Sequence, residues 1–331
     1  MKIAGKFPSV RLRRVRNSKW MRELISENNL SVKDLILPIF IRDGKAKVES
    51  IKSMPGVNRY TVDKLDLIMK KVIKYKIPMV ALFPYTPKNK KDELGSEALN
   101  KNNLICKSIK LIKKRYSKIG IMCDVALDPY TSHGHDGVLD EKGINNDETI
   151  KILVKQALLQ AQMGCDVIAP SDMMDGRIGI IRKALDKNNF QNISILSYSA
   201  KYASSFYGPF RDAVGSKGNL KNDKKTYQMD FRNSNEAYRE IGLDIKEGAD
   251  IVMVKPGLPY LDIIRNIKQN FKIPVFAYQV SGEYSLIKFG IKYNLINDDA
   301  ILESLIAFKR AGASAIVTYF ALDIAERLKK I

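Results

Sequence analysis

The stretch AILESLIAFKRAGASAIVTYF, residues 300–320, contains one complete unit of the fold. Its first part has apolar residues at helical spacing and ends in Gly312, and the run AIVTYF (315–320) that follows is short, apolar and rich in β-branched residues. Glycine at such a place is typical of a helix C-cap, and a short apolar run bounded by such signals is typical of a buried strand. The stretch therefore predicts an amphipathic helix followed directly by a strand.

The same pattern recurs along the chain. Eight short apolar runs alternate with helical segments: LILPIFI (35–41), MVALFP (79–84), GIMCDVAL (120–127), DVIAPS (166–171), SILSYSA (194–200), DIVMVKP (250–256), PVFAYQV (274–280) and AIVTYF (315–320). Continuous apolar runs are typical of parallel strands that helices cover on both faces. The sequence thus predicts an α/β fold, a (β/α)8 TIM barrel. An open doubly wound sheet is the alternative, although no GxGxxG follows the first strand and no GxxxxGK[ST] occurs.

Two segments lie outside the repeating pattern. Residues 1–34 precede the first strand, with one helix expected at about 19–28, and we expect them to form an N-terminal oligomerisation arm on the barrel of residues 35–331. After the fifth strand, residues 208–230 are rich in Gly, Asn and Lys and are too long for an ordinary loop, so they are a candidate active-site lid.

The net charge of +20 and pI near 9.6 raise the question of a nucleic-acid partner. The lysines are spread along helical segments such as KKVIKYK, a pattern typical of solvated faces, so we expect no nucleic acid. No run of about 18 apolar residues suggests a membrane span. The three cysteines lack CxxC spacing, which favours a reducing compartment, and we expect a cytoplasmic protein.

Catalytic groups of such barrels lie at the C-terminal ends of the strands. The polar residues at these positions are Asp124, Asp128, Ser171, Asp172, Lys201, Lys255, Tyr278, Ser281 and Tyr319. Lys201 and Lys255 end adjacent strands. Burial and a neighbouring ammonium both lower a lysine pKa and free the amine to attack a carbonyl, so the pair predicts Schiff-base chemistry. The alternative is that each lysine only caps its strand and points to solvent.

Further groups could bind substrate. The basic residues of the candidate lid could hold a carboxylate: Arg211, Lys217, Lys221, Lys224 and Lys225. A solvated loop is the alternative for most of them. Ser281 and Tyr319 could hold a second carboxylate through their hydroxyl groups, or could be ordinary polar residues at strand ends.

The loop DVALDPYTSHGHDG (124–137) suggests a metal site, because it combines Asp124, Asp128, His133, His135 and Asp136. Hard oxygen ligands suit magnesium or an alkali ion, and the lack of cysteine argues against a thiolate zinc site. Histidines in a Gly-flanked loop are also common as turn and packing residues, so both interpretations stay open.

With these residues in view, the sequence closely resembles the porphobilinogen synthase family, also called 5-aminolevulinate dehydratase. The resemblance covers nearly the whole chain and is carried by DVALDPYTSHGHDG, APSDMMDGRIGIIR, SYSAKYASSFYGPFRDA, MVKPGLPYLDI, YQVSGEY and TYFA. It implies a (β/α)8 barrel that condenses two 5-aminolevulinate molecules to porphobilinogen in tetrapyrrole (haem) biosynthesis.

The resemblance also implies roles for individual residues. Lys201 and Lys255 match lysines that each form a Schiff base with one substrate molecule, and Asp124 matches an acidic group near the reacting centre. Arg211 and Lys224 match residues that hold one substrate carboxylate, although many members have arginine at position 224 and Lys221 is a neighbouring candidate. Ser281 and Tyr319 match those for the other carboxylate. The expected substrate-binding set is completed by Tyr278, Tyr207, Phe210, Gln228 and Ser171.

Metal use is where the chain departs from part of the family. Zinc-using members carry cysteines where this chain has Ala126, Asp128 and Asp136, so the resemblance implies an aspartate-rich, magnesium-dependent type without catalytic zinc. Glu240 matches a glutamate that holds an allosteric, water-coordinated Mg2+; from its own pattern it would be a solvated helix residue. The family assembles as a homo-octamer through the N-terminal arms.

Two competing functions remain at this point. A class I aldolase would also use a Schiff base in a barrel, but it needs only one imine-forming lysine. A basic nucleic-acid-binding protein would instead show binding that weakens steeply with salt.

Overall fold

The computed structural model describes residues 5–215, 220 and 223–329. In this part of the chain eight parallel strands form a closed barrel: β1 Leu35–Arg42, β4 Met79–Tyr85, β5 Gly120–Val125, β8 Val167–Pro170, β9 Ser194–Lys201, β10 Ile251–Lys255, β11 Val275–Gln279 and β12 Ala315–Thr318. The barrel closes where β12 pairs with β1, through Leu35 with Ile316 and Ile36 with Val317. All eight predicted strands are present, so the (β/α)8 barrel is confirmed and the open sheet is wrong.

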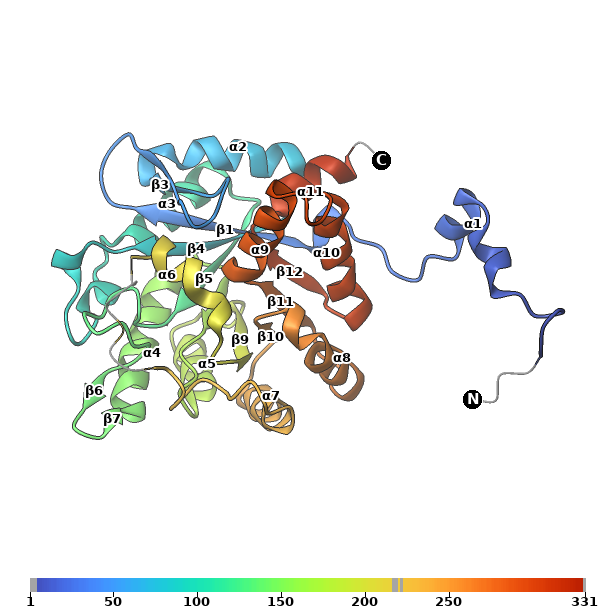
Figure 1. Ribbon diagram of the computed structural model, residues 1–331. Coiled ribbons are helices and arrows are strands. Elements are labelled where there is room, and N and C mark those ends of the chain that lie inside the picture. Colours follow the sequence, from blue (N-terminus) through green and yellow to red (C-terminus); the bar gives the residue numbers. More distant parts are fainter. Residues whose placement is uncertain (1–4, 216–219, 221–222, 330–331) are drawn as a thin grey trace.

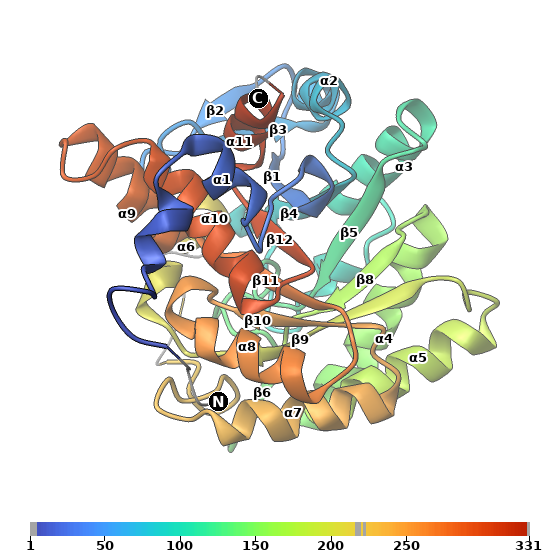
Figure 2. The same ribbon diagram turned by 90° about the vertical axis from the view of Figure 1, so that its right-hand side faces the viewer.

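Helices cover the outer face of the barrel, as Figures 1 and 2 show from two directions. They are α2 Leu65–Tyr75, α3 Leu104–Arg115, α4 Asn146–Met163, α5 Arg177–Lys187, α7 Asn235–Glu247, α8 Leu261–Asn270, α9 Ser281–Lys292, α10 Asp299–Ala311 and α11 Ala321–Leu328, with the short α6 Gly208–Ala213 after β9. Gly164 and Gly312 end α4 and α10 with φ of 102° and 111°, the left-handed conformation expected of a C-cap.

The strands are buried on both faces, which explains why they show no alternation of polar and apolar residues. In β1 every residue from Leu35 to Ile41 is buried. Near the C-terminal end of the barrel, aromatic side chains fill the interior: the ring of Phe40 lies 5.8 Å from that of Tyr319, and Phe83 lies 6.3 Å from Tyr278. Because these rings contact one another, the barrel interior is a packed core. Burial of each side chain of this size stabilises the fold by about 1.5–3 kcal/mol.

A hairpin of β2 Val48–Ser50 and β3 Asn58–Thr61 extends the sheet beyond the end of β1. Arg59 of this hairpin is buried, and its guanidinium donates to the carbonyl oxygens of Asp212 at 2.6 Å and Ala213 at 2.7 Å. Both carbonyls lie at the C-terminal end of α6, where a helix has unpaired acceptors. The hairpin therefore fixes the position of α6 over the barrel mouth. A second hairpin, β6 Leu139–Asp140 and β7 Gly143–Ile144, precedes α4.

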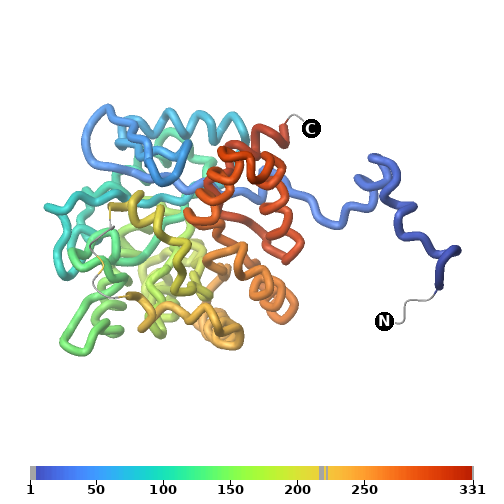
Figure 3. Tube along the Cα trace, viewed as in Figure 1, coloured from blue at the N-terminus to red at the C-terminus, as the bar shows by residue number. Residues whose placement is uncertain are grey.

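The first part of the described arm, residues 5–24, projects away from the barrel (Figures 1 and 3) and contains a 3-10 helix, Leu12–Arg16, and α1, Lys19–Leu24. The last part packs on the barrel: Leu30 is buried, and Asp34, in a 3-10 helix at Val32–Asp34, pairs with Lys309 of α10 at 3.1 Å. The predicted helix at 19–28 is thus shorter than expected, consistent with the poor helix propensity of Ser26, Asn28 and Asn29. Of the helices that the structure describes, none has the length and apolar character needed to cross a membrane.

Candidate active site

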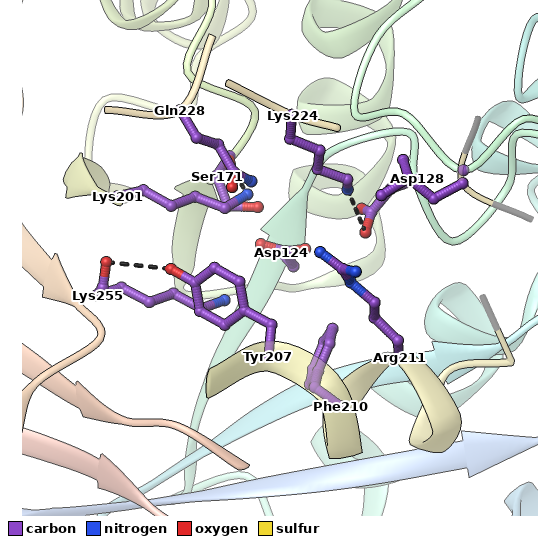
Figure 4. Close-up of a pocket in the computed structure, with 12 residues that line it drawn as sticks. Asp124, Asp128, Ser171, Lys201, Tyr207, Phe210, Arg211, Lys224, Gln228 and Lys255 are labelled. Carbon is purple, nitrogen blue, oxygen red and sulfur yellow. Dashed lines mark hydrogen bonds and ion pairs between the residues drawn. The ribbon is translucent and has the colours of Figure 1, made fainter. Parts of the chain in front are cut away.

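One pocket at the C-terminal ends of the strands brings together residues that are far apart in the sequence (Figure 4). Most of the predicted site residues line it, from four barrel strands or their ends and from the segment after β9. The lining consists of Asp124, Asp128, Gly134, Ser171, Lys201, Tyr207, Phe210, Arg211, Leu220, Lys224, Gln228 and Lys255.

Lys201 and Lys255 end neighbouring strands and are partners in the parallel register of β9 and β10. Both are buried, at 5% and 7% exposed. The Nζ atom of Lys201 lies 3.0 Å from a carboxylate oxygen of Asp136 and donates to the carbonyl oxygen of Ser171. The alternative in which the lysines point to solvent is therefore wrong.

Lys255 has a different environment, made of aromatic rings. Its Nζ lies 4.8 Å from the ring centre of Tyr278, 5.0 Å from Tyr198, 5.3 Å from Phe210 and 5.5 Å from Tyr207. Burial, followed by the nearby charge of Lys201, lowers the pKa of Lys255 to about 7, while Asp124 acts in the opposite direction. An amine with such a pKa is present in its neutral, nucleophilic form near neutral pH.

Asp136 contacts two ammonium groups, those of Lys201 and Lys224. It is fully buried and accepts from Lys201 at 3.0 Å, from Lys224 at 2.7 Å and from the Tyr227 hydroxyl at 2.9 Å. Burial opposes ionisation, but Lys201 and Lys224 together hold the pKa of Asp136 well below its usual range. From the sequence we considered Asp136 as a metal ligand or a replaced cysteine, and this ion-pairing arrangement was missed.

Asp124, in β5, is a half-buried carboxylate that lines the pocket. Burial raises its pKa to about 6, although Lys255 and Lys201 lower it and Asp128 raises it further. Its Oδ1 atom is buried without a hydrogen-bond partner in the described part of the chain. A carboxyl group with this pKa can gain and lose a proton near neutral pH, as a general acid or base does.

The helix α6 covers the pocket and carries Phe210 and Arg211. The ring of Phe210 packs on Phe40 at 5.7 Å and, edge on, on Phe83 at 5.3 Å. Arg211 points into the pocket in the direction of Asp124 (Figure 4). Aromatic packing thus holds the helix at the mouth of the barrel.

Three predicted substrate-binding residues lie beside this pocket and contact other protein groups. The Ser281 hydroxyl accepts from the backbone N–H of Phe210 at 2.8 Å and donates to the carbonyl oxygen of Phe206 at 3.4 Å. The hydroxyl groups of Tyr278 and Tyr319 lie 3.1 Å apart. Ser281 therefore also holds α6, the helix that covers the pocket, in place.

The remaining basic residues of the candidate lid differ in position. Lys224 is half-buried and contacts Asp136 and, at 3.4 Å, Asp128; burial opposes its charge, but these two carboxylates raise its pKa. Lys225 is exposed beside Asp223. Lys217 and Lys221 lie outside the described residues.

The two histidines of the loop after β5 contact protein groups. Nε2 of His133 lies 3.1 Å from the carbonyl oxygen of Glu93, and Nδ1 of His135 lies 3.1 Å from the Tyr227 hydroxyl. Considering only residues 5–215, 220 and 223–329, no three His, Cys, Asp or Glu side chains gather as a metal-binding group. These contacts favour the packing interpretation of the histidines.

Glu240 lies apart from this pocket, in the middle of α7. It is half-buried and lines a second pocket together with Asp175 and Glu236. Burial, with a further contribution from Asp244, raises the pKa of Glu240. The helical pattern alone had indicated a solvated residue, so the structure corrects that interpretation.

Comparison with known proteins identifies the family. Residues 9–327 match the sequence model described as delta-aminolevulinic acid dehydratase. A delta-aminolevulinic acid dehydratase of Bradyrhizobium diazoefficiens is 54% identical over 97% of this chain and 91% of its own length, and that of Methanothermus sociabilis is 51% identical over 98% and 100%. The crystal structure of the Toxoplasma gondii enzyme, in complex with the reaction product porphobilinogen, superposes with a TM-score of 0.95 at 44% identity, covering 97% of this chain and 92% of that one.

A closed (β/α)8 barrel with two buried lysines on neighbouring strand ends is typical of enzymes that attack carbonyl groups with an amine. The sequence and structure matches narrow this class to one family. The chain is an enzyme that belongs to the delta-aminolevulinic acid dehydratase family.

Proposed function

We propose that the protein condenses two molecules of 5-aminolevulinate to porphobilinogen, through Schiff bases on Lys201 and Lys255, in the biosynthesis of tetrapyrroles such as haem. The observation that carries this proposal is the burial of two lysines in register on β9 and β10, in a chain that belongs to this family. Each amine adds to the keto carbon of one substrate, and the keto oxygen leaves as water. A carbon–carbon bond and a carbon–nitrogen bond between the substrates then complete the pyrrole and release the lysines.

The side chains around the lysines fit the other requirements of this reaction. Asp124, with a pKa raised to about 6, moves protons at the reacting carbon or orients an amine. Arg211 and Lys224 bind one substrate carboxylate, and Ser281 and Tyr319 bind the other. The substrates lie against Tyr207, Phe210, Tyr278, Gln228 and Ser171, and residues 208–230 close over them as a lid.

Magnesium, we further propose, binds at Glu240 and acts allosterically. The carboxylate oxygens of Glu240 suit a hard cation, and the carboxylates of Asp175 and Glu236, which line the same pocket, add negative charge around it. A single direct carboxylate with several waters is sufficient for magnesium. When bound, the ion supplies positive charge that offsets the cost of burying Glu240.

We propose that the enzyme uses no catalytic zinc. The carboxylates of Asp128 and Asp136, at two of the positions where zinc-using relatives have cysteine, already contact the ammonium group of Lys224. Carboxylates paired with lysines are poor ligands for a borderline-soft ion that prefers thiolate and imidazole.

A homo-octamer, assembled through the arm of residues 1–34, and a cytoplasmic location complete the proposal. The arm exposes large apolar side chains, with Phe7 and Leu12 each 71% exposed, Trp20 64% and Leu24 75%. Apolar surface of this kind is stabilised when another copy of the chain covers it. The three free, buried cysteines fit a reducing compartment.

The test is borohydride reduction in the presence of 5-aminolevulinate, followed by peptide mapping. Reduction converts an imine into a stable adduct, so adducts are expected on both Lys201 and Lys255. An adduct on one lysine only, with cleavage of sugar phosphates, would favour an aldolase. No adduct on either lysine would contradict the proposal.

A further inference from the structure

Glu283, in the first turn of α9, is a buried carboxylate that belongs to neither the pocket lining nor the predicted site. Its side chain is 3% exposed. Oε1 accepts from the backbone N–H of Leu258 at 2.6 Å, and Oε2 accepts from Val280 at 2.6 Å and from Gly257 at 3.3 Å. One carboxylate thus satisfies three backbone donors that come from two different segments.

These segments are the ends of two neighbouring barrel strands. Gly257 and Leu258 follow Lys255 at the end of β10, and Val280 follows β11. Burial raises the pKa of Glu283 to about 7, while the three N–H groups lower it, so the carboxylate is ionised above that pH. Because hydrogen bonds to an ionised acceptor are short and about twice as strong as neutral ones, the carboxylate then holds the two strand ends in one arrangement. The fit is tight, since a Cβ on Gly257 would lie 2.3 Å from the ring of Phe308.

The two residues before Glu283 contact α6, which covers the pocket, and Phe206 just before this helix. Ser281 accepts from the N–H of Phe210 in α6, and a Cβ on Gly282 would lie 2.4 Å from the carbonyl oxygen of Phe206. Three consecutive residues, Ser281, Gly282 and Glu283, therefore connect the base of the lid, the end of β11 and the backbone that follows Lys255.

The contacts of Lys201 are of a different kind. Its Nζ is held by Asp136 and by the carbonyl oxygen of Ser171, which follow β5 and β8, whereas Glu283 bonds to the backbone after β10 and β11. A change at Glu283 consequently reaches Lys255 through the backbone two and three residues beyond it. It reaches Lys201 one step later, because the N–H of Tyr202 donates to the carbonyl oxygen of Lys255 at 2.9 Å, while the Lys201 amine keeps its own partners.

We infer that Glu283 is a positioning residue for Lys255: it sets the backbone at the end of β10, and thereby directs the Lys255 amine at the substrate carbonyl. The inference rests on the proposed function, in which Lys255 forms an imine.

The experiment compares reduced adducts on the two lysines in wild-type protein and in Glu283→Gln. Glutamine keeps the shape but replaces one acceptor by a donor, so at least one of the three N–H groups faces another donor. The ratio of the Lys255 adduct to the Lys201 adduct is expected to fall roughly 10–100-fold, the loss that a displacement of about 1 Å produces. Glu283→Asp keeps the charge on a shorter side chain and is expected to lower the ratio less.

Asp250→Asn provides the matched control. Asp250 lies at the other end of the same strand segment and its carboxylate accepts the N–H of Ile195 at 2.7 Å. Its loss removes a comparable bond far from the Lys255 amine, so the adduct ratio should equal that of wild type.

The outcomes separate the two proposals. Absence of a Lys255 adduct in wild type would reject the proposed function. Normal wild-type adducts with an unchanged ratio in Glu283→Gln, or an equal fall at both lysines, would reject the positioning role alone. If Glu283→Gln does not fold, the same comparison with Glu283→Asp decides.

Discussion

Lys201 and Lys255 are register partners on adjacent strands, but one is held by a carboxylate and the other is surrounded by aromatic rings. Two amines that start from the same sequence pattern are thereby given different chemical environments. Such a difference is what an asymmetric reaction between two identical substrates requires, because each molecule must be treated differently.

The neutral form of Lys255 should control a pH-dependent step. With a pKa of about 7, the amine is mostly protonated at pH 6 and mostly neutral at pH 8, so the rate of imine trapping on Lys255 is expected to rise across this interval. Asp124 raises this pKa, and Asp124→Asn should therefore move the midpoint to lower pH. Peptide mapping after brief borohydride pulses at each pH measures both effects. A midpoint that stays in place or rises in Asp124→Asn would contradict the assignment.

Replacing the shared carboxylate should destabilise the protein. Asp136→Asn leaves the ammonium groups of the buried Lys201 and the half-buried Lys224 without their common partner, so the free energy of unfolding is expected to fall by about 3–5 kcal/mol. Urea unfolding followed by circular dichroism measures the change. Asp128→Asn is the control, because it removes only the 3.4 Å contact to Lys224 and should cost less than half as much. Equal losses in the two variants would argue against Asp136 as the common partner.

The hairpin residue Arg59 should affect substrate binding from outside the pocket. Arg59→Lys cannot reproduce the fork that binds the carbonyls of Asp212 and Ala213, so α6 and its Arg211 are expected to lose their fixed position. We expect KM for 5-aminolevulinate to rise about 10–100-fold, the equivalent of one or two hydrogen bonds to a charged group. Steady-state kinetics measures this value.

Arg182 offers a matched comparison for Arg59. It also donates to two carbonyl oxygens, those of Ile193 at 2.7 Å and Phe190 at 3.1 Å, but at the start of β9, away from the pocket. Arg182→Lys should leave KM unchanged. A similar increase in both variants would mean that the effect of Arg59 is general destabilisation.

Removal of the Glu240 carboxylate should abolish the response to magnesium. After treatment with a chelator, wild-type activity is expected to increase on addition of Mg2+, whereas Glu240→Gln should remain at its basal level. Glu247→Gln, on the same helix but bonded to the N–H of Gly179, should respond as wild type does. A full response in Glu240→Gln would place the ion elsewhere. Complete loss of wild-type activity with a zinc-selective chelator would contradict the proposed absence of catalytic zinc.

Deletion of residues 1–28, most of the arm, should reduce the size of the assembly. The remaining chain keeps the buried Leu30, the ion pair of Asp34 with Lys309 and every strand of the barrel, so it should fold while losing the exposed apolar surface of the arm. Light scattering coupled to size exclusion is the measurement, and an unchanged mass would exclude the arm as the main contact.

The barrel was predictable because helix and strand signals repeat eight times and the runs are too apolar for an exposed sheet. What the pattern could not give is the orientation of side chains within each strand. In a strand buried on both faces, such as LILPIFI, inward and outward residues are equally apolar. Phe40 and Phe83, which support Phe210, were therefore missed, as was Tyr198 beside Lys255.

The site was predicted where a residue lies at a strand end, as Lys201 and Lys255 do. Contacts between distant loops could not be predicted in this way. Asp136 and Lys224 are 88 residues apart in the sequence, and nothing in the residues around either one indicates that they form a pair. Likewise Glu283 follows a predicted strand at a position typical of a helix start, where an acidic residue has an ordinary explanation in the helix dipole.

The seam between β1 and β12 determines when the molecule can be completed during synthesis. Leu35 pairs with Ile316, so almost the entire chain must leave the ribosome before the cylinder can close. The strands that carry the lysines are neighbours in the sequence order and can associate earlier, as part of an open sheet with an unpaired edge. The nascent chain therefore passes through a stage in which both lysines are already in place but the barrel is still open. At this stage the unpaired strand edge makes the chain most prone to aggregate.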